Sequence, residues 1–212
     1  MNNQIKFSNI NFGPFLFRTK VDKSLVKFLL EEGLKASKSH NKNLAGHLKS
    51  QFLYPDTIQE KFYTHFFSSY VNAYRQAHCN YNRLPLDVPL EVSYNDLWIN
   101  FMRSGEFNPS HTHVSDISFV LFLDVPKEIH EQAEQFEGVG GGPGAISFHY
   151  GETTIPKWVN SQYSCIPNTG DLFIFPGLLQ HWVSPFQANV TRISVSGNLI
   201  ITNKERFPRD YF

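Results

Sequence analysis

The sequence predicts an α+β jelly roll in which β-strands predominate. Aromatic residues make up 15% of the chain, including 20 phenylalanines, and such side chains are enriched in strands. The first ninety or so residues carry apolar side chains at helical spacing, whereas short apolar runs separated by Gly, Pro and Asn clusters occupy the rest. We therefore expect helices packed on the outside of one sheet of a sandwich or small barrel.

Helices are expected in the N-terminal region. In VDKSLVKFLLEEGLKASK, one helical stripe contains Leu25, Val26, Leu29, Leu30 and Leu34. A second helix is expected after Pro55, with Asp56 as its N-cap and Gln59 as the capping-box partner. Its mainly aromatic stripe, spaced four residues apart, consists of Ile58, Phe62, Phe66, Tyr70 and Tyr74.

Strands are expected from about residue 90 onward. The segments that predict them are VSYNDLWINFM, ISFVLFLDVP, GAISFHYG, QYSCIP, DLFIFP and TRISVSGNLII. The glycine-rich stretch EGVGGGPG (137–144) is expected to be a loop between strands. Because no repeat or domain boundary is evident, residues 1–212 are interpreted as a single domain. Its helical support region covers about residues 1–90, and its jelly-roll core covers about 91–203.

Charge and cysteine content narrow the possible partners. Lys plus Arg and Asp plus Glu both total 19, so no overall field favours nucleic acid or an anionic membrane. Cys79 and Cys165 lie far apart and outside any CxxC pattern, which predicts reduced thiols of an intracellular protein. The N-terminal MNNQIKFSNINFGPF lacks the pattern of a signal peptide, and no run approaches the ~18 apolar residues of a membrane helix. A cytoplasmic protein without a membrane or nucleic-acid partner is expected.

The segment NPSHTHVSD contains the first candidate metal ligands. His111 and His113 are two residues apart, so on an extended backbone their side chains point to the same face. A further histidine, His181, comes after a strand that ends in proline, in FIFPGLLQHWVSPF. Taken alone the pair fits either a polar loop or half of a metal site.

The last predicted strand has one polar and one largely apolar face. Its polar positions are Arg192, Ser194, Ser196 and Asn198. On this strand alone, a polar face turned toward solvent is the more common arrangement. The alternative is a polar face turned into the cavity of the jelly roll, where a buried arginine requires an anionic partner.

In combination, these segments resemble the non-haem Fe(II)- and 2-oxoglutarate-dependent oxygenases. The matching residues, in order, are NPSHTHVSDISFVLFLDVP, GAISFHYG, NTGDLFIFPGLLQHWVSPF and TRISVSGN, within about residues 94–200. The likeness is strongest to the small oxygenases of this superfamily that are common in marine tailed-phage genomes, and a viral origin would place the protein in the host cell cytoplasm.

The resemblance implies a double-stranded β-helix, cupin-like in shape, with Fe(II) at one mouth and 2-oxoglutarate as co-substrate. It implies that His111, His113 and His181 bind iron, which 2-oxoglutarate chelates through its keto acid. Arg192 then holds the distal carboxylate of 2-oxoglutarate, because a guanidinium fork binds carboxylates in a bidentate way, and Ser194 adds a hydrogen bond. O2 and an unknown substrate complete the set of partners.

One position departs from the usual His-x-Asp…His ligand pattern of that superfamily. The third residue of the first motif is His113, so either three histidines bind the metal or Asp116 replaces His113. The two-residue period of a strand favours His113. Asp116 is then the alternative ligand, or an acceptor that orients a ligand.

The resemblance predicts a 2-oxoglutarate- and Fe(II)-dependent dioxygenase, by default a hydroxylase. The alternative is a cupin-like metal-binding protein without oxygenase activity, an isomerase or small-molecule binder, and a non-enzymatic virion or scaffold jelly roll is the third possibility. Trp98 and Asn100 share a strand face and line the cavity or pack in the core. The histidines expected at the surface are His40, His47, His65, His78 and His130. His149 lies in a predicted strand and is a candidate for lining the cavity.

Overall fold

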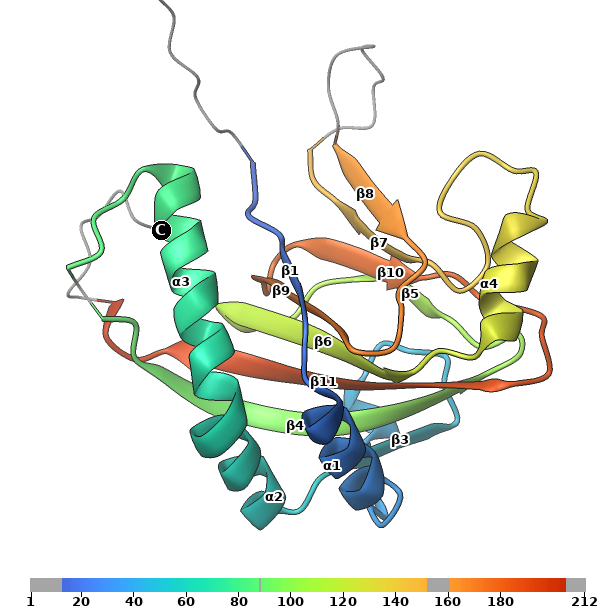
Figure 1. Ribbon diagram of the computed structural model, residues 1–212, viewed down its shortest axis with the longest axis horizontal. Coiled ribbons are helices and arrows are strands. Elements are labelled where there is room, and N and C mark those ends of the chain that lie inside the picture. Colours follow the sequence, from blue (N-terminus) through green and yellow to red (C-terminus); the bar gives the residue numbers. More distant parts are fainter. Residues whose placement is uncertain (1–12, 88, 152–160, 205–212) are drawn as a thin grey trace, which may run out of the picture.

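The computed structural model describes residues 13–87, 89–151 and 161–204. Most of the N-terminal segment on which the expectation of no signal peptide rests lies outside these residues. The described chain forms two antiparallel sheets, with helices on the outer face of the larger one (Figure 1). This arrangement confirms the predicted α+β, mainly β jelly roll.

The large sheet has seven strands in the order β1-β9-β6-β11-β4-β3-β2. In chain order these are β1 (Phe17–Lys20), β2 (Lys38–Ser39), β3 (Ser50–Leu53), β4 (Val92–Arg103), β6 (Ile117–Asp124), β9 (Asp171–Pro176) and β11 (Thr191–Ile201). The four longest come from segments predicted as strands. The three short strands from the N-terminal region were not predicted, because pairing with the edges of an existing sheet stabilises them rather than a pattern of their own.

The small sheet has four strands in the order β5-β10-β7-β8. They are β5 (Asn108–His111), β7 (Ile146–His149), β8 (Gln162–Cys165) and β10 (Gln180–Val183). β5 contains the beginning of the paired-histidine motif, and β10 contains His181. The sheet that carries these histidines thus lies across the core from the strand that carries Arg192.

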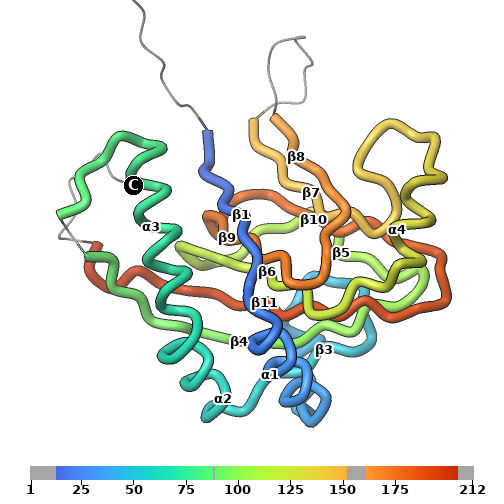
Figure 2. Tube along the Cα trace, viewed as in Figure 1, coloured from blue at the N-terminus to red at the C-terminus, as the bar shows by residue number. Residues whose placement is uncertain are grey.

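The helices lie mainly on one face of the large sheet. They are α1 (Lys23–Gly33), the short η1 (Asn41–Asn43), α2 (Asp56–Lys61), η2 (Phe62–Phe67), α3 (Ser68–Asn82) and α4 (Lys127–Glu134). The path of the chain shows α1, α2 and α3 together on this face, with α4 near the small sheet (Figure 2). The charged segment that forms α4 was not predicted as a helix, since Ile129 is its only buried residue.

The second predicted helix differs from expectation at its start and in its middle. Pro55 is the N-cap and Asp56 is the first helical residue, without a side-chain capping bond, so the predicted Asp56 cap is wrong. η2 is a π-helical turn, which adds residues per turn and rotates the rest of the helix. The buried side chains therefore pass from Phe62 to Phe67 and Val71, and the predicted Phe66 and Tyr70 are only partly buried.

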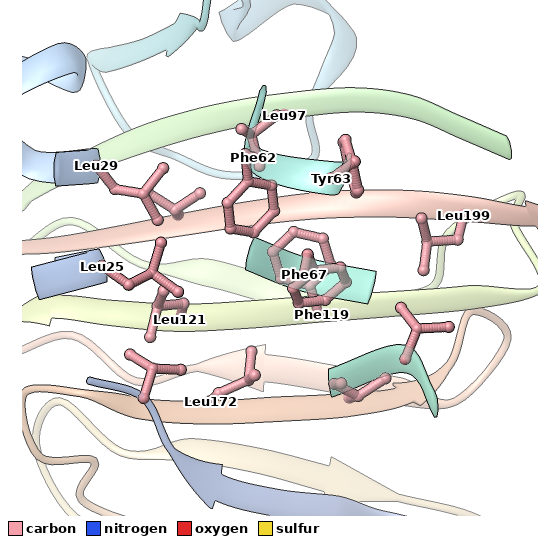
Figure 3. Close-up of a cluster of buried hydrophobic side chains, with 14 of the residues drawn as sticks. Leu25, Leu29, Phe62, Tyr63, Phe67, Leu97, Phe119, Leu121, Leu172 and Leu199 are labelled. Atoms are coloured by element: carbon pink, nitrogen blue, oxygen red, sulfur yellow. The ribbon is translucent and has the colours of Figure 1, made fainter. Parts of the chain in front are cut away.

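The helices are held to the sheet by an apolar cluster rich in aromatic rings. Leu25 and Leu29 of α1 and Phe67 of η2 point onto the sheet, where they meet residues such as Phe119 and Leu121 of β6 (Figure 3). The rings of Phe67 and Phe119 lie 4.2 Å apart between centroids. This cluster fixes the outer face of β4, β6 and β11 and leaves their inner face for the site.

A second apolar cluster fills the space between the two sheets. Its centre is formed by Phe122, Phe148, Phe173 and Phe175, each no more than 2% exposed. Phe122 and Phe175 of this cluster also line the cavity that contains the motif histidines. Among the described residues, no helix is long and apolar enough to cross a membrane.

Candidate metal centre and adjoining cavity

Two short strands and one turn bring the three motif histidines together. His111 of β5 and His181 of β10 are direct partners in the antiparallel register. His113 lies just beyond β5, where its backbone N–H donates to the carbonyl of Gly177 at 2.8 Å. A Cβ at Gly177 would come within 2.1 Å of the Ser115 carbonyl oxygen, so a glycine is required for this approach.

The three imidazoles form one compact group. A ring nitrogen from each of His111, His113 and His181 lies within 4.8 Å of the others. Nδ1 of His111 donates to the Pro109 carbonyl at 2.7 Å, and Nδ1 of His181 donates to the Leu179 carbonyl at 2.8 Å. Because a carbonyl oxygen only accepts, both rings carry their proton on Nδ1. Their Nε2 lone pairs are therefore available to a metal.

Burial keeps these imidazoles neutral. Desolvation, followed by the nearby charge of His111, lowers the pKa of His181 to about 3 and that of His113 to about 4. Desolvation also lowers the pKa of His111. At neutral pH the group therefore offers three uncharged nitrogen donors, the form that binds a transition metal.

Asp116 is engaged elsewhere. Its Oδ2 accepts the backbone N–H of Ile201 at 2.8 Å, and its Oδ1 lies 2.6 Å from the ammonium of Lys204. Among the described residues, no carboxylate belongs to the three-histidine group. The structure thus brings His111, His113 and His181 together and leaves Asp116 in contact with the end of β11.

Arg192 is buried in the same cavity. Arg192 is 2% exposed, and it lines the same cavity as the three histidines. One guanidinium nitrogen donates to the Gly144 carbonyl at 2.8 Å, another lies 2.9 Å from the sulfur of Met102, and Nε has no partner. The guanidinium carbon sits 5.2 Å from the ring centroid of Phe122.

No described carboxylate pairs with this guanidinium. Burial lowers the pKa of Arg192 to about 10, so the side chain is still charged at neutral pH. A buried cation held only by a carbonyl, a thioether and an aromatic ring is incompletely compensated. The site therefore favours an anion, and a carboxylate fits the fork of the guanidinium.

Ser194 and its neighbours complete this wall of the cavity. Ser194 is 6% exposed and lies two residues from Arg192 on the same face of β11. Three residues of the polar face of this strand thus line the cavity and do not face solvent: Arg192, Ser194 and Ser196. Trp98 and Asn100 of the neighbouring β4 line the same cavity, as does Gln51 of β3.

Some assignments of single residues from sequence were incomplete or wrong. Gln51 was not singled out, because it lies on a strand that the pattern did not predict. His40, expected at the surface, is 5% exposed and packs against Trp98 with ring centroids 5.7 Å apart. His149 does not line the histidine cavity but a separate hollow beside Thr112 and Leu178.

A family comparison covers the stretch of the chain that contains most of these residues. Residues 96–198 match the model of a family described as "Putative 2OG-Fe(II) oxygenase". The matched stretch contains the three histidines, Arg192 and Ser194. No curated relative matches the chain.

Solved structures with a similar fold are very different in sequence. HygX from Streptomyces hygroscopicus, with nickel, 2-oxoglutarate and hygromycin B bound, is 8% identical with a TM-score of 0.59, over 91% of this chain and 84% of that one. A prolyl-4-hydroxylase from Pseudomonas putida is 15% identical with a TM-score of 0.51, over 89% and 93%. A 2OG-Fe(II) oxygenase family oxidoreductase from Burkholderia pseudomallei is 12% identical with a TM-score of 0.54, over 82% and 77%. At these identities the likeness shows a shared fold.

Proposed function

We propose that this protein, a 2-oxoglutarate- and Fe(II)-dependent oxygenase, is a hydroxylase-type dioxygenase whose iron is held by His111, His113 and His181. The observation that carries this proposal is the combination of two features in one cavity. Three neutral imidazoles converge there, and a buried arginine lines the same cavity without an anionic partner. The three imidazoles could bind a metal ion. A dicarboxylate such as 2-oxoglutarate could bind that metal at one end and the arginine at the other.

The histidine group fits Fe(II) in donor type and number. Imidazole is a suitable ligand for iron, and three protein ligands leave positions open on an octahedral ion. The hydrogen bonds from His111 and His181 to backbone carbonyls fix the ring orientations before the metal arrives. Because His113 stands where the superfamily usually has a carboxylate, the site keeps the full +2 charge of the ion.

Arg192 and Ser194 are proposed to bind the distal carboxylate of 2-oxoglutarate. The guanidinium offers an unpaired Nε in the cavity, and Ser194 adds a hydroxyl from the same strand face. When bound, Fe(II) and 2-oxoglutarate supply the oxidation, in which O2 and 2-oxoglutarate become succinate and CO2 while a substrate C–H bond is hydroxylated. The role of the chain is to hold the co-substrate, orient it and exclude water from it.

A cupin-like binder without oxygenase activity accounts less well for the cavity. Such a protein requires the histidines but has no use for a desolvated arginine beside them. An intracellular location is part of this proposal, because Cys79 and Cys165 lie far apart in the sequence and outside any CxxC pattern. Kinship with phage oxygenases stays a prediction, and the substrate is set by side chains around the mouth of the cavity.

Turnover of the co-substrate tests the proposed function. Protein reconstituted with Fe(II) under air should convert 2-oxoglutarate to succinate, slowly without a primary substrate and faster when a suitable one is present. Protein treated with chelator, and the His181→Ala variant, should form none. Succinate production at the level of free Fe(II) in all three samples would contradict the assignment.

A further inference from the structure

Three buried polar side chains form a straight row across the large sheet. Gln51 of β3 is the register partner of Asn100 of β4, and Asn100 is the register partner of Ser194 of β11. Direct partners on one face of a sheet have side chains in contact. All three line the histidine cavity, and none is more than 6% exposed.

The hydrogen bonds within this row run in one direction. Nε2 of Gln51 donates to Oδ1 of Asn100 at 2.8 Å. The Asn100 amide must then present Nδ2 to β11, where it lies 3.4 Å from Oγ of Ser194 and 3.3 Å from Oγ of Ser196. Because each serine oxygen accepts from Asn100, the hydroxyl proton of Ser194 is left to donate to another group.

We propose that Gln51 and Asn100 are positioning residues that hold the Ser194 hydroxyl as a donor to the distal carboxylate of 2-oxoglutarate. The inference rests on the proposed function and extends it beyond the matched family region, because Gln51 lies outside residues 96–198. A serine hydroxyl rotates freely between donor and acceptor roles. Fixing the Asn100 amide from the far side removes that freedom before the carboxylate binds, which lowers the entropic cost of binding.

Gln51 is suited to this role rather than to a purely structural one. Its backbone N–H donates to Oδ1 of Asn41 and its backbone carbonyl accepts from His40, so β3 is held without the side chain. The side chain makes its one hydrogen bond to Asn100, while Oε1 has no partner. A glutamine buried for stability alone would be expected to satisfy both ends of its amide.

The hydrogen bonds that lead from Gln51 through Asn100 to Ser194 are called the relay below. Two substitutions of Gln51 test the direction of this relay. Gln51→Met keeps the length of the side chain and removes the donor to Asn100. Gln51→Glu, when ionised, can only accept, which turns the Asn100 amide around and makes Ser194 donate to Asn100 instead of to the co-substrate. The matched control is Gln59→Met, since Gln59 is also a buried glutamine, donates to the Tyr54 carbonyl at 2.9 Å and does not line the cavity.

The measurement is the affinity of the Mn(II)-loaded protein for two keto acids, by calorimetry. Gln51→Glu should weaken 2-oxoglutarate binding about tenfold, which is the loss expected for one hydrogen bond to a charged group, and Gln51→Met somewhat less. Binding of pyruvate, a keto acid without the distal carboxylate, should be unchanged. Mn(II) affinity should be unchanged in both variants and Gln59→Met should resemble wild type in all three assays.

A double-mutant cycle with Ser194→Ala separates the relay from a general effect of charge. If Gln51 acts through Ser194, substituting Gln51 in the Ser194→Ala background should cause no further loss of 2-oxoglutarate affinity. An equal loss for pyruvate, a loss that persists without Ser194, or unchanged 2-oxoglutarate affinity in both Gln51 variants would overturn the relay. If one variant fails to fold, the ratio of the two keto acid affinities in the other gives the same answer.

The wild-type protein distinguishes failure of the relay from failure of the proposed function. Wild-type protein that loads Mn(II) but does not bind 2-oxoglutarate would overturn the proposed function and the relay together. Wild-type protein that binds 2-oxoglutarate, with Gln51 variants that bind it equally well, would overturn the relay alone.

Discussion

Replacing Arg192 by methionine should strongly weaken 2-oxoglutarate binding while leaving the metal centre and the fold in place. Methionine keeps much of the volume of the arginine but carries no charge. Burial lowers the pKa of Arg192 to about 10, because the buried surroundings disfavour the charged form of the guanidinium. Because the guanidinium lacks a carboxylate partner, Arg192→Met should cost the metal-free protein little stability or even raise it.

The effect on the co-substrate should be much larger. Loss of one partner of a buried charged pair costs about 2–5 kcal/mol. That range corresponds to roughly 30-fold to several-thousand-fold weaker binding of 2-oxoglutarate at about 1.4 kcal/mol per decade. Arg192→Ala should show the same loss, and Arg192→Lys should recover only part of it, because an ammonium is a point charge and does not form the bidentate fork.

The assay is titration of 2-oxoglutarate into Mn(II)-loaded wild type and variants, with thermal unfolding measured in parallel. Equal affinities in wild type and Arg192→Met would refute the reasoning, because the arginine would then not contact the distal carboxylate. A variant that is unfolded or no longer binds Mn(II) would show instead that Arg192 supports the structure. Arg192→Lys is the matched control for this second outcome, since it keeps the positive charge.

Three further predictions concern the metal centre. His113→Ala should weaken Mn(II) binding far more than Asp116→Ala, because Asp116 contacts Lys204 and the backbone of Ile201. Asp116→Ala should instead lower the free energy of unfolding by about 1–2 kcal/mol. The reverse order of metal affinities would rule out the three-histidine site. His181→Ala should abolish stoichiometric metal binding with the fold retained, checked by elemental analysis and circular dichroism, and unchanged metal content would exclude His181 as a ligand. In chelator, the protein should lose stability as pH falls below 6.5, because the pKa of His113 is lowered to about 4 and that of His181 to about 3, and the unfolded chain therefore takes up protons first. Each of these two histidines should cost about 2 kcal/mol by pH 5, so denaturation curves should shift more between pH 7.5 and 5 for wild type than for the His113→Gln, His181→Gln double variant.

The candidate residues of the cavity could be predicted from sequence because their signals are local. His111 and His113 are two residues apart, and Arg192 and Ser194 alternate along one strand, so side-chain direction can be read from the period of the backbone. The position of His181 could be predicted because the strand before it ends at Pro176 and the chain then turns back. The resemblance to a known ligand pattern then joined these separate signals into one site.

The parts that sequence missed depend on contacts between distant segments. Gln51 lies on β3, whose four residues pair with β4 at the edge of the large sheet, and nothing in SQFL marks a strand. The position of Asp116 could not be settled either, since it depends on the bends after His113 and on the end of β11, 85 residues away. The π-helical turn at Phe62–Phe67 likewise rotates the buried stripe without a local signal.

Anaerobic titration of Fe(II)-loaded protein with 2-oxoglutarate tests the central claim most directly, because a keto acid chelated to Fe(II) gives a visible charge-transfer band. The account predicts a band that requires both Fe(II) and 2-oxoglutarate and saturates at one equivalent of each. It should be absent in His181→Ala and should require much more 2-oxoglutarate in Arg192→Met. A protein that binds one Fe(II) yet shows no band at saturating 2-oxoglutarate would contradict the claim that this cavity is an oxygenase active site.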